Sequence, residues 1–113
     1  MIVVIDYGMG NIGSILNMLK KLRIGAIGSS DPSDIANAEK LILPGVGAFD
    51  SGMTNLQQSG LIPILEKRVR EQSIPILGMC LGLQLFTKKS EEGNLSGLGW
   101  IDAATVKFRF GER

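Results

Sequence analysis

The sequence predicts an α/β domain with a doubly wound, mainly parallel sheet that carries helices on both faces. Short apolar runs alternate with segments whose hydrophobic residues recur at helical spacing. The first run, residues 1–5, is apolar throughout, which is typical of a strand buried on both faces. Glycine-rich turns at Gly8, Gly45 and Gly78 each follow an apolar run. Because ligands bind at the carboxyl ends of parallel strands, these three turns indicate where a site would lie.

The elements follow in order along the chain. Hydrophobic residues at helical spacing predict a helix over residues 12–22, and a weaker apolar run predicts a strand over 24–28. A polar connection with a short helical turn after Pro32 leads to a strand over 40–43.

Three helices and two further strands are expected in the second half. The pattern predicts helices over residues 49–58 and 61–71, a strand over 74–77, and a short helix to about Lys89. Residues 105–110 alternate polar and apolar side chains, which predicts an exposed antiparallel strand.

The composition is that of one globular domain, residues 1–113. The net charge of +1 suggests neither a nucleic-acid partner nor an anionic membrane surface. No apolar run approaches the roughly 20 residues of a membrane-spanning helix, and the N-terminus lacks a signal-peptide pattern. The single cysteine excludes an internal disulfide and fits a reducing compartment, so we expect a cytoplasmic protein.

Cys80 is the candidate nucleophile. It lies in the frame Gly78-x-Cys80-x-Gly82 between a predicted strand and a predicted helix, which is the spacing of a nucleophile elbow. A turn this tight strains its central residue, and a Cβ on either flank would clash. The start of the helix favours the thiolate. A lone cysteine is more often a core residue, but this frame favours acyl transfer, with the Leu81 N–H donating to the oxyanion.

The loop Pro44-Gly45-Val46-Gly47 is either a simple strand-ending turn or the source of a second oxyanion donor. Its two glycines would let the peptide between them flip between an idle and an active orientation. Gln84, four residues after Cys80, lies on the same helix face and could reach a ligand. The segment 90–93 is either a solvated loop or a carboxylate site for a substrate ammonium group.

The segment Gly8-Met9-Gly10-Asn11-Ile12-Gly13 gives the main competing interpretation, because it matches a dinucleotide-binding fingerprint between a strand and a helix. That fingerprint also needs an acidic residue at the tip of the second strand. The nearest acid, Asp31, lies beyond the tip, and Asp6 would repel a pyrophosphate.

Four stretches occur in the order found in one known family: residues 6–11, 44–49, 78–85, and 90–93 with 97–99. With them, the whole chain resembles the glutamine amidotransferase subunit of imidazole glycerol phosphate synthase, in the class I (triad) glutamine amidotransferase family. The family carries the first stretch without binding a nucleotide there.

The resemblance implies a flavodoxin-like fold and no cofactor or metal. It implies hydrolysis of glutamine to glutamate and ammonia, which passes to a (β/α)8-barrel cyclase subunit in a heterodimer for histidine biosynthesis. By matching position, Cys80 would form the γ-glutamyl thioester. The other matched residues are Val46, Gly47 and Leu81 for the oxyanion region, Gly45, Gly47, Gln84 and Glu92 for glutamine, and Asn11 for the partner interface.

Histidine is absent from the chain, whereas the family completes its triad with a later His-x-Glu. We therefore expect the N-terminal part of such a domain, incomplete at its C-terminus and without glutaminase activity by itself. Three alternatives remain open: a paralogue that supplies ammonia for amino-sugar synthesis in surface polysaccharides, a nucleotide-binding module built on Gly8–Gly13, and a non-catalytic scaffold.

Overall fold

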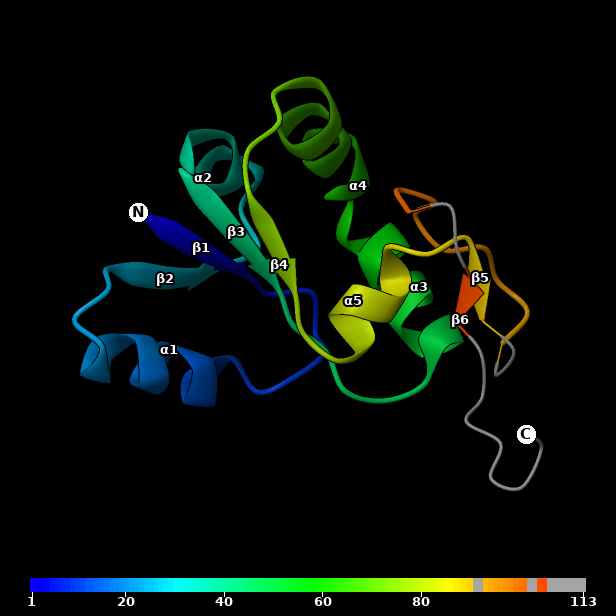
Figure 1. Cartoon of the computed structure of the whole chain (residues 1–113), viewed down its shortest axis with the longest axis horizontal. Helices are drawn as coiled ribbons and strands as arrows, with labels where there is room; N and C mark the ends of the chain where they lie inside the picture. Colours follow the sequence, from blue (N-terminus) through cyan, green and yellow to red (C-terminus); the bar gives the residue numbers. More distant parts are fainter. Residues whose placement is uncertain (91–92, 102–103, 106–113) are drawn as a thin grey trace.

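A four-stranded parallel sheet forms the centre of the computed structural model, which describes residues 1–90, 93–101 and 104–105 (Figure 1). The strand order is β2-β1-β3-β4. The strands are β1 (Ile2–Ile5), β2 (Ala26–Ser29), β3 (Lys40–Leu43) and β4 (Ile76–Gly78). All three neighbouring pairs are parallel, which confirms the predicted sheet.

Helices lie on both faces of this sheet, as the sequence predicts (Figure 1). They are α1 (Ile12–Lys21), α2 (Pro32–Asn37), α3 (Phe49–Ser59), α4 (Ile62–Leu65), the π-helix Glu66–Glu71 and α5 (Leu81–Leu85). Among the described residues, none of these helices is long and apolar enough to cross a bilayer.

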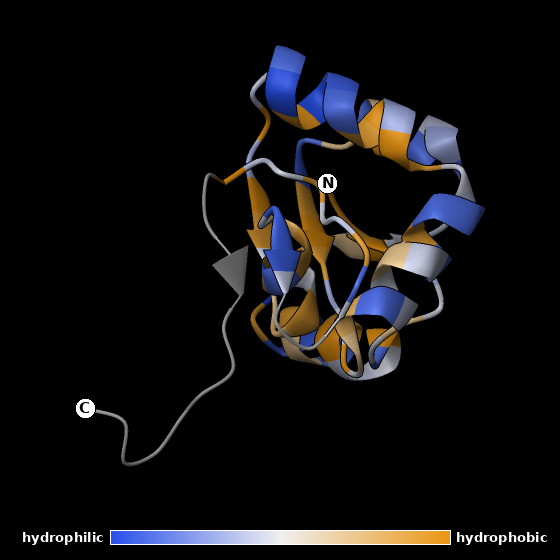
Figure 2. Cartoon of the chain, turned by 90° about the vertical axis from the view of Figure 1, so that its right-hand side faces the viewer, coloured by the Kyte–Doolittle hydropathy of each residue, from blue (hydrophilic) through white to orange (hydrophobic). Residues whose placement is uncertain are grey.

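The alternating side chains of β1 divide the core into two clusters. Val3 and Ile5 point to the larger cluster, which α2, α3, α4 and α5 cover. Val4 points to the opposite face, where it packs with Leu19 of α1 and Ile42 of β3. Coloured by hydropathy, the strands are mainly hydrophobic and the helices alternate between hydrophilic and hydrophobic positions (Figure 2). The apolar content of β1 is thus explained by burial on both faces.

Three details differ from the sequence-based expectation. The segment expected as one α-helix over 61–71 changes to a π-helix at Glu66, a change that leaves the apolar spacing almost unaltered. The helix after Cys80 ends at Leu85 rather than near Lys89. It ends early because the carbonyl oxygens of residues 85–88 accept hydrogen bonds from N–H groups of residues 97–101 instead of continuing the helix. The donor and acceptor pairs are Leu98 to Leu85, Ile101 to Phe86, Gly99 to Thr87 and Gly97 to Lys88.

The third difference concerns the last strand. β6 (Ala104–Thr105) pairs with β5 (Lys89–Ser90) in parallel, not antiparallel. The remainder of the strand expected over 105–110 lies outside the described residues. Trp100 stacks on Phe86 with ring centroids 5.2 Å apart and donates from Nε1 to Glu66.

Candidate active site

The turns that follow β1, β3 and β4 meet at the carboxyl edge of the sheet. Backbone hydrogen bonds join the last two: the Met79 N–H donates to the Leu43 oxygen at 3.0 Å and the Leu81 N–H to the Gly45 oxygen at 3.2 Å. The first turn touches the second, because a Cβ built on Gly10 would lie only 3.0 Å from the Gly45 nitrogen. The three glycine-rich turns therefore form one continuous surface, as predicted.

Cys80 lies between β4 and α5 in a strained backbone conformation, with φ 54° and ψ −117°. Its side chain is exposed. A Cβ on Gly82 would stand 1.8 Å from the Leu43 oxygen, and one on Gly78 would stand 2.6 Å from the Leu83 Cα. Real Cβ atoms do not approach other atoms so closely, so both flanking glycines are required sterically. The elbow geometry predicted for Gly78-x-Cys80-x-Gly82 is confirmed.

A small cavity of about 160 Å³ opens beside the cysteine. Three elements contribute to it: the N-terminus of α1, the loop after β3 and the elbow itself. Its lining residues are Gly10, Asn11, Ser14, Ile15, Pro44, Gly45, Val46, Met79 and Cys80. The structure thus places Cys80, Val46 and Asn11, which the sequence analysis selected from three distant segments, around one hollow.

The oxyanion donors do not converge on the cysteine in this structure. The Leu81 N–H is paired with the Gly45 carbonyl. Peptides of the described residues are trans, so the Val46 N–H points away from the side on which the Gly45 oxygen lies. Gly47 follows with φ 118°, a value that favours glycine. The Gly45–Val46 peptide would have to turn before both predicted donors could face the cysteine.

The remaining candidate residues are placed as follows. Gln84 lies one helical turn after the cysteine, half-buried, and its N–H donates to the Cys80 oxygen. Asn11 caps α1, with its Oδ1 accepting from the Ser14 N–H at 3.0 Å. Glu92 lies outside the described residues.

Asp50 is a residue that sequence reasoning missed. Its carboxylate accepts hydrogen bonds from the N–H groups of Asn94 and Leu95. A Cβ on Gly93 would lie 2.2 Å from its Oδ1, so this contact requires glycine at that position. Asp50 follows the loop after β3 directly, at the start of α3. It fixes the segment that begins one residue after Glu92, and no local sequence signal identifies that partner.

Tyr7 is the second missed residue. It is 5% exposed, and its hydroxyl donates to the Pro44 carbonyl. Burial raises the pKa of Tyr7 to about 12. A sequence signal was present: a buried tyrosine after an apolar strand needs a hydrogen-bond partner.

The dinucleotide interpretation finds little support in this geometry. The side of Gly10 that would have to accept a close ligand faces Pro44 and Gly45. The Asp31 carboxylate caps α2 and so is not free to bind a ribose, since its Oδ1 accepts from the Ser33 N–H at 2.9 Å.

Within residues 1–90, 93–101 and 104–105, no three His, Cys, Asp or Glu side chains group closely enough to hold a metal ion.

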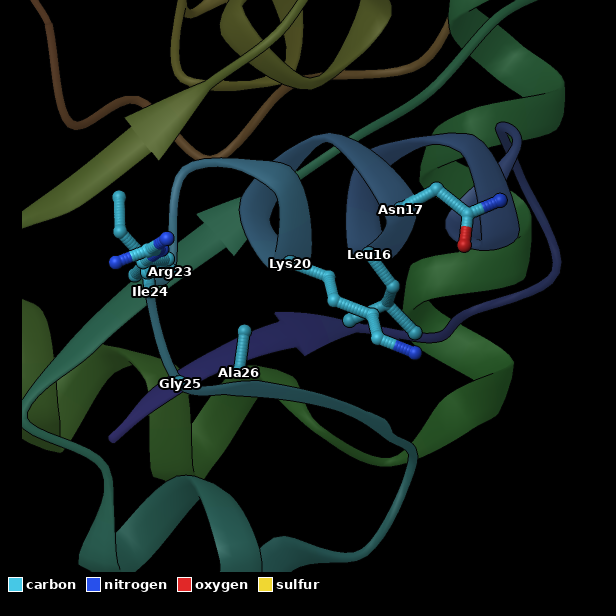
Figure 3. Close-up of a pocket in the computed structure, with 7 residues that line it drawn as sticks. All are labelled: Leu16, Asn17, Lys20, Arg23, Ile24, Gly25 and Ala26. Carbon is cyan, nitrogen blue, oxygen red and sulfur yellow. The ribbon is translucent and has the colours of Figure 1, made fainter.

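A larger hollow of about 480 Å³ lies between α1 and the amino end of β2, at the sheet edge opposite the cysteine. Figure 3 shows its cationic side chains: Lys20 and Arg23 extend in different directions, and Asn17 points away from both. Their charges do not converge on one point, so this hollow is not a candidate anion site.

An α/β sheet with an exposed cysteine elbow at its carboxyl edge defines a class of domain built for nucleophilic attack by a thiol. The chain belongs to the class I glutamine amidotransferase family, because residues 3–107 match the model of that family.

The most similar relatives include two named "Imidazole glycerol phosphate synthase subunit HisH 2". The one from Methanococcus maripaludis is 58% identical over 113 residues, all of this chain and 56% of that protein. The one from Pseudomonas aeruginosa is 56% identical over 96% of this chain and 54% of that protein. A subunit HisH from Bdellovibrio bacteriovorus is 44% identical over 96% of this chain and 53% of that protein.

A solved structure described as a glutamine amidotransferase shares the fold. It superposes with a TM-score of 0.76 at 24% identity, over 98% of this chain and 59% of that one. The chain spans about half the length of the curated relatives that it matches. The remaining half of those relatives has no counterpart in the residues described here.

Proposed function

We propose that this chain forms the nucleophile-bearing half of a glutaminase domain that releases ammonia from glutamine. The single observation that carries the proposal is the conformation of Cys80: exposed, strained and at the carboxyl edge of the sheet. Such strain persists only where the surrounding structure imposes it, and here Gly78 and Gly82 are needed to do so. The family match and the names of the relatives support glutamine as the substrate.

The chemistry follows from the thiol. The Cys80 sulfur attacks the side-chain amide carbon of glutamine and forms a tetrahedral intermediate with a negatively charged oxygen. Collapse of that intermediate expels the amide nitrogen, which takes up a proton and leaves as ammonia. Water then hydrolyses the γ-glutamyl thioester to glutamate and restores the thiol. The proton transfers need a general base, for which the described residues offer no histidine.

The oxyanion is stabilised after the loop rearranges. Rotation of the Gly45–Val46 peptide releases the Leu81 N–H from the Gly45 oxygen and turns the Val46 N–H toward the sulfur. Gly45, Gly47, Gln84 and Glu92 are proposed to contact the bound glutamine.

The released ammonia is proposed to pass to a cyclase subunit with a (β/α)8 barrel, which makes imidazole glycerol phosphate in histidine biosynthesis. The printed names of the relatives support this partner class, since each is a subunit of imidazole glycerol phosphate synthase. Asn11, at the rim of the cysteine cavity, is proposed to face that partner in a heterodimer. A free, exposed thiol suits the reducing cytoplasm.

The test continues this chain with the C-terminal part of the Methanococcus maripaludis relative, which supplies the absent half. We expect this continued chain to release glutamate, and a glutamine-derived electrophile to label Cys80. The Cys80→Ala version should do neither, and the 113-residue chain alone should show no turnover. Labelling that survives Cys80→Ala would contradict the proposal.

The acceptor is tested separately by adding purified synthase partners. Transfer of ammonia to an amino-sugar enzyme instead of the cyclase would identify the paralogue. Retention of an NAD analogue, without labelling of Cys80, would favour the nucleotide-binding alternative.

A further inference from the structure

The buried hydroxyl of Tyr7 has no part in the chemistry proposed above, although it touches the loop that must rearrange. Tyr7 lies two residues after the end of β1 and, with its ring in the larger core cluster, donates to the Pro44 carbonyl at the start of that loop. A Cβ on Gly45 would lie 2.5 Å from the phenol oxygen. The hydroxyl is therefore bonded to Pro44 and lies beside Gly45, whose carbonyl belongs to the rotating peptide.

Two neighbours of Tyr7 in the same turn make further contacts with this loop. Gly10 adopts φ 90°, and its backbone lies against the Gly45 nitrogen and Cα. The Cε of Met9 would be 3.3 Å from a Cβ on Gly47. The turn of residues 7–10, here called the support turn, thus meets the loop at Pro44, Gly45 and Gly47. This packing explains why the turn is rich in glycine without any bound nucleotide.

The opposite side of the loop is held by the hydrogen bond from the Leu81 N–H to the Gly45 oxygen. That bond must break when the Gly45–Val46 peptide turns, whereas the bond from Tyr7 to Pro44 lies one peptide earlier. The two contacts lie on either side of the rotating peptide. The bond from Tyr7 to Pro44 can persist during the rotation, whereas the bond from Leu81 to Gly45 must break.

We propose that Tyr7 is a positioning residue, whose hydroxyl fixes the Pro44 carbonyl so that only the Gly45–Val46 peptide rotates to build the oxyanion hole. This inference rests on the proposed glutaminase function. A loop without the anchor would move as a whole, and the Val46 N–H would not arrive at a fixed distance from the sulfur. The burial that raises the pKa of Tyr7 keeps this donor protonated at neutral pH.

Hydrogen exchange on the 113-residue chain tests the anchor without any enzyme activity. Tyr7→Phe removes only the hydroxyl. We expect exchange of the Leu81 amide to accelerate about two- to tenfold, the effect of one ordinary hydrogen bond, while the Leu41 and Ile42 amides of β3 stay unchanged. Ser59→Ala is the matched control: it removes a hydroxyl bonded to the Leu56 carbonyl, far from the loop, and should leave Leu81 unaffected.

Alkylation separates positioning from general damage. The Cys80 sulfur attacks the tetrahedral carbon of iodoacetamide, and no oxyanion forms in that reaction. The rate of alkylation should therefore be equal in the parent and in Tyr7→Phe. In the continued chain described above, kcat for glutamine should fall about tenfold while KM changes less than twofold, because Tyr7 does not touch the substrate.

Three results would overturn the inference: unchanged Leu81 exchange, acceleration shared equally by the β3 amides, or a rise in KM with kcat preserved. If Tyr7→Phe prevents folding, Gly10→Ala disturbs the same support turn where it meets Gly45 and must accelerate exchange of the Leu81 amide selectively. Absence of glutamine turnover in the parent continued chain would refute the proposed function, whereas the exchange experiment would still decide whether Tyr7 anchors the loop.

Discussion

The backbone N–H of Leu81 donates to the carbonyl oxygen of Gly45 across 3.2 Å. This hydrogen bond joins the turn after β3 to the nucleophile elbow. It uses the Leu81 N–H, the donor that the proposed catalysis would need. An ordinary hydrogen bond contributes about 1 kcal/mol, so a bound substrate can replace this one at small cost. Under the proposed function, the Gly45 carbonyl occupies in this structure the donor that the oxyanion would use.

Replacing Cys80 by glycine should stabilise the fold. The φ of 54° and ψ of −117° strain any side chain at this position. We expect Cys80→Gly to be about 1 kcal/mol more stable than Cys80→Ala, after allowing for the larger chain entropy of unfolded glycine. Urea unfolding measures this. Ala36→Gly is the control: at this exposed position inside α2 it should lower stability instead, and a loss of stability at both positions would argue against strain at Cys80.

Gly82→Ala should damage the fold severely, because its Cβ would stand 1.8 Å from the Leu43 oxygen. We expect a loss of about 3 kcal/mol or more, in the range of serious packing defects. Gly25→Ala is matched to it, since a Cβ there meets no atom within 4 Å. Thermal unfolding should show little change at Gly25. Equal effects of the two substitutions would disprove the steric account of the elbow.

Tyr7→Phe should remove part of the alkaline loss of stability. The folded pKa of Tyr7 is raised to about 12, above its ordinary value near 10. The stabilisation from its protonated, buried form is therefore complete below pH 10 and declines as pH rises through 12, by about 1.4 kcal/mol per unit. The free energies of unfolding of the parent and the variant, measured from about pH 8 to about 11.5, should approach each other as the pH rises. Parallel curves would exclude a shifted pKa.

Asp50→Asn should loosen the segment that follows Glu92. The carboxylate accepts from the N–H groups of Asn94 and Leu95, and the amide offers one acceptor where two oxygens stood. We expect a loss of about 1–3 kcal/mol and faster exchange at Asn94 and Leu95. Glu71→Gln, at an exposed position, is the charge-matched control and should change neither. Protection retained at Asn94 in Asp50→Asn would show that other contacts hold this segment.

Local patterns were sufficient to predict the sheet, its parallel strands and the elbow. Apolar runs marked β1 and β3 closely, and the glycines around Cys80 reported a steric requirement that spacing alone reveals. The contacts of Tyr7 with Pro44 and of Asp50 with Asn94 join residues 37 and 44 positions apart, so no local pattern encodes them. The π-helix escaped prediction because its apolar spacing resembles that of an α-helix.

The order of strands also decides when the thiol reaches its place during synthesis. β1 pairs with β2 on one side and β3 on the other, so the first 43 residues already contain three adjoining strands. β4, which precedes the cysteine by two residues, joins at the outer side of β3. A ribosome that releases the chain from its N-terminus therefore delivers the residues of these three strands before the reactive sulfur emerges. The strand that positions the thiol is the last of the four to become available to the sheet.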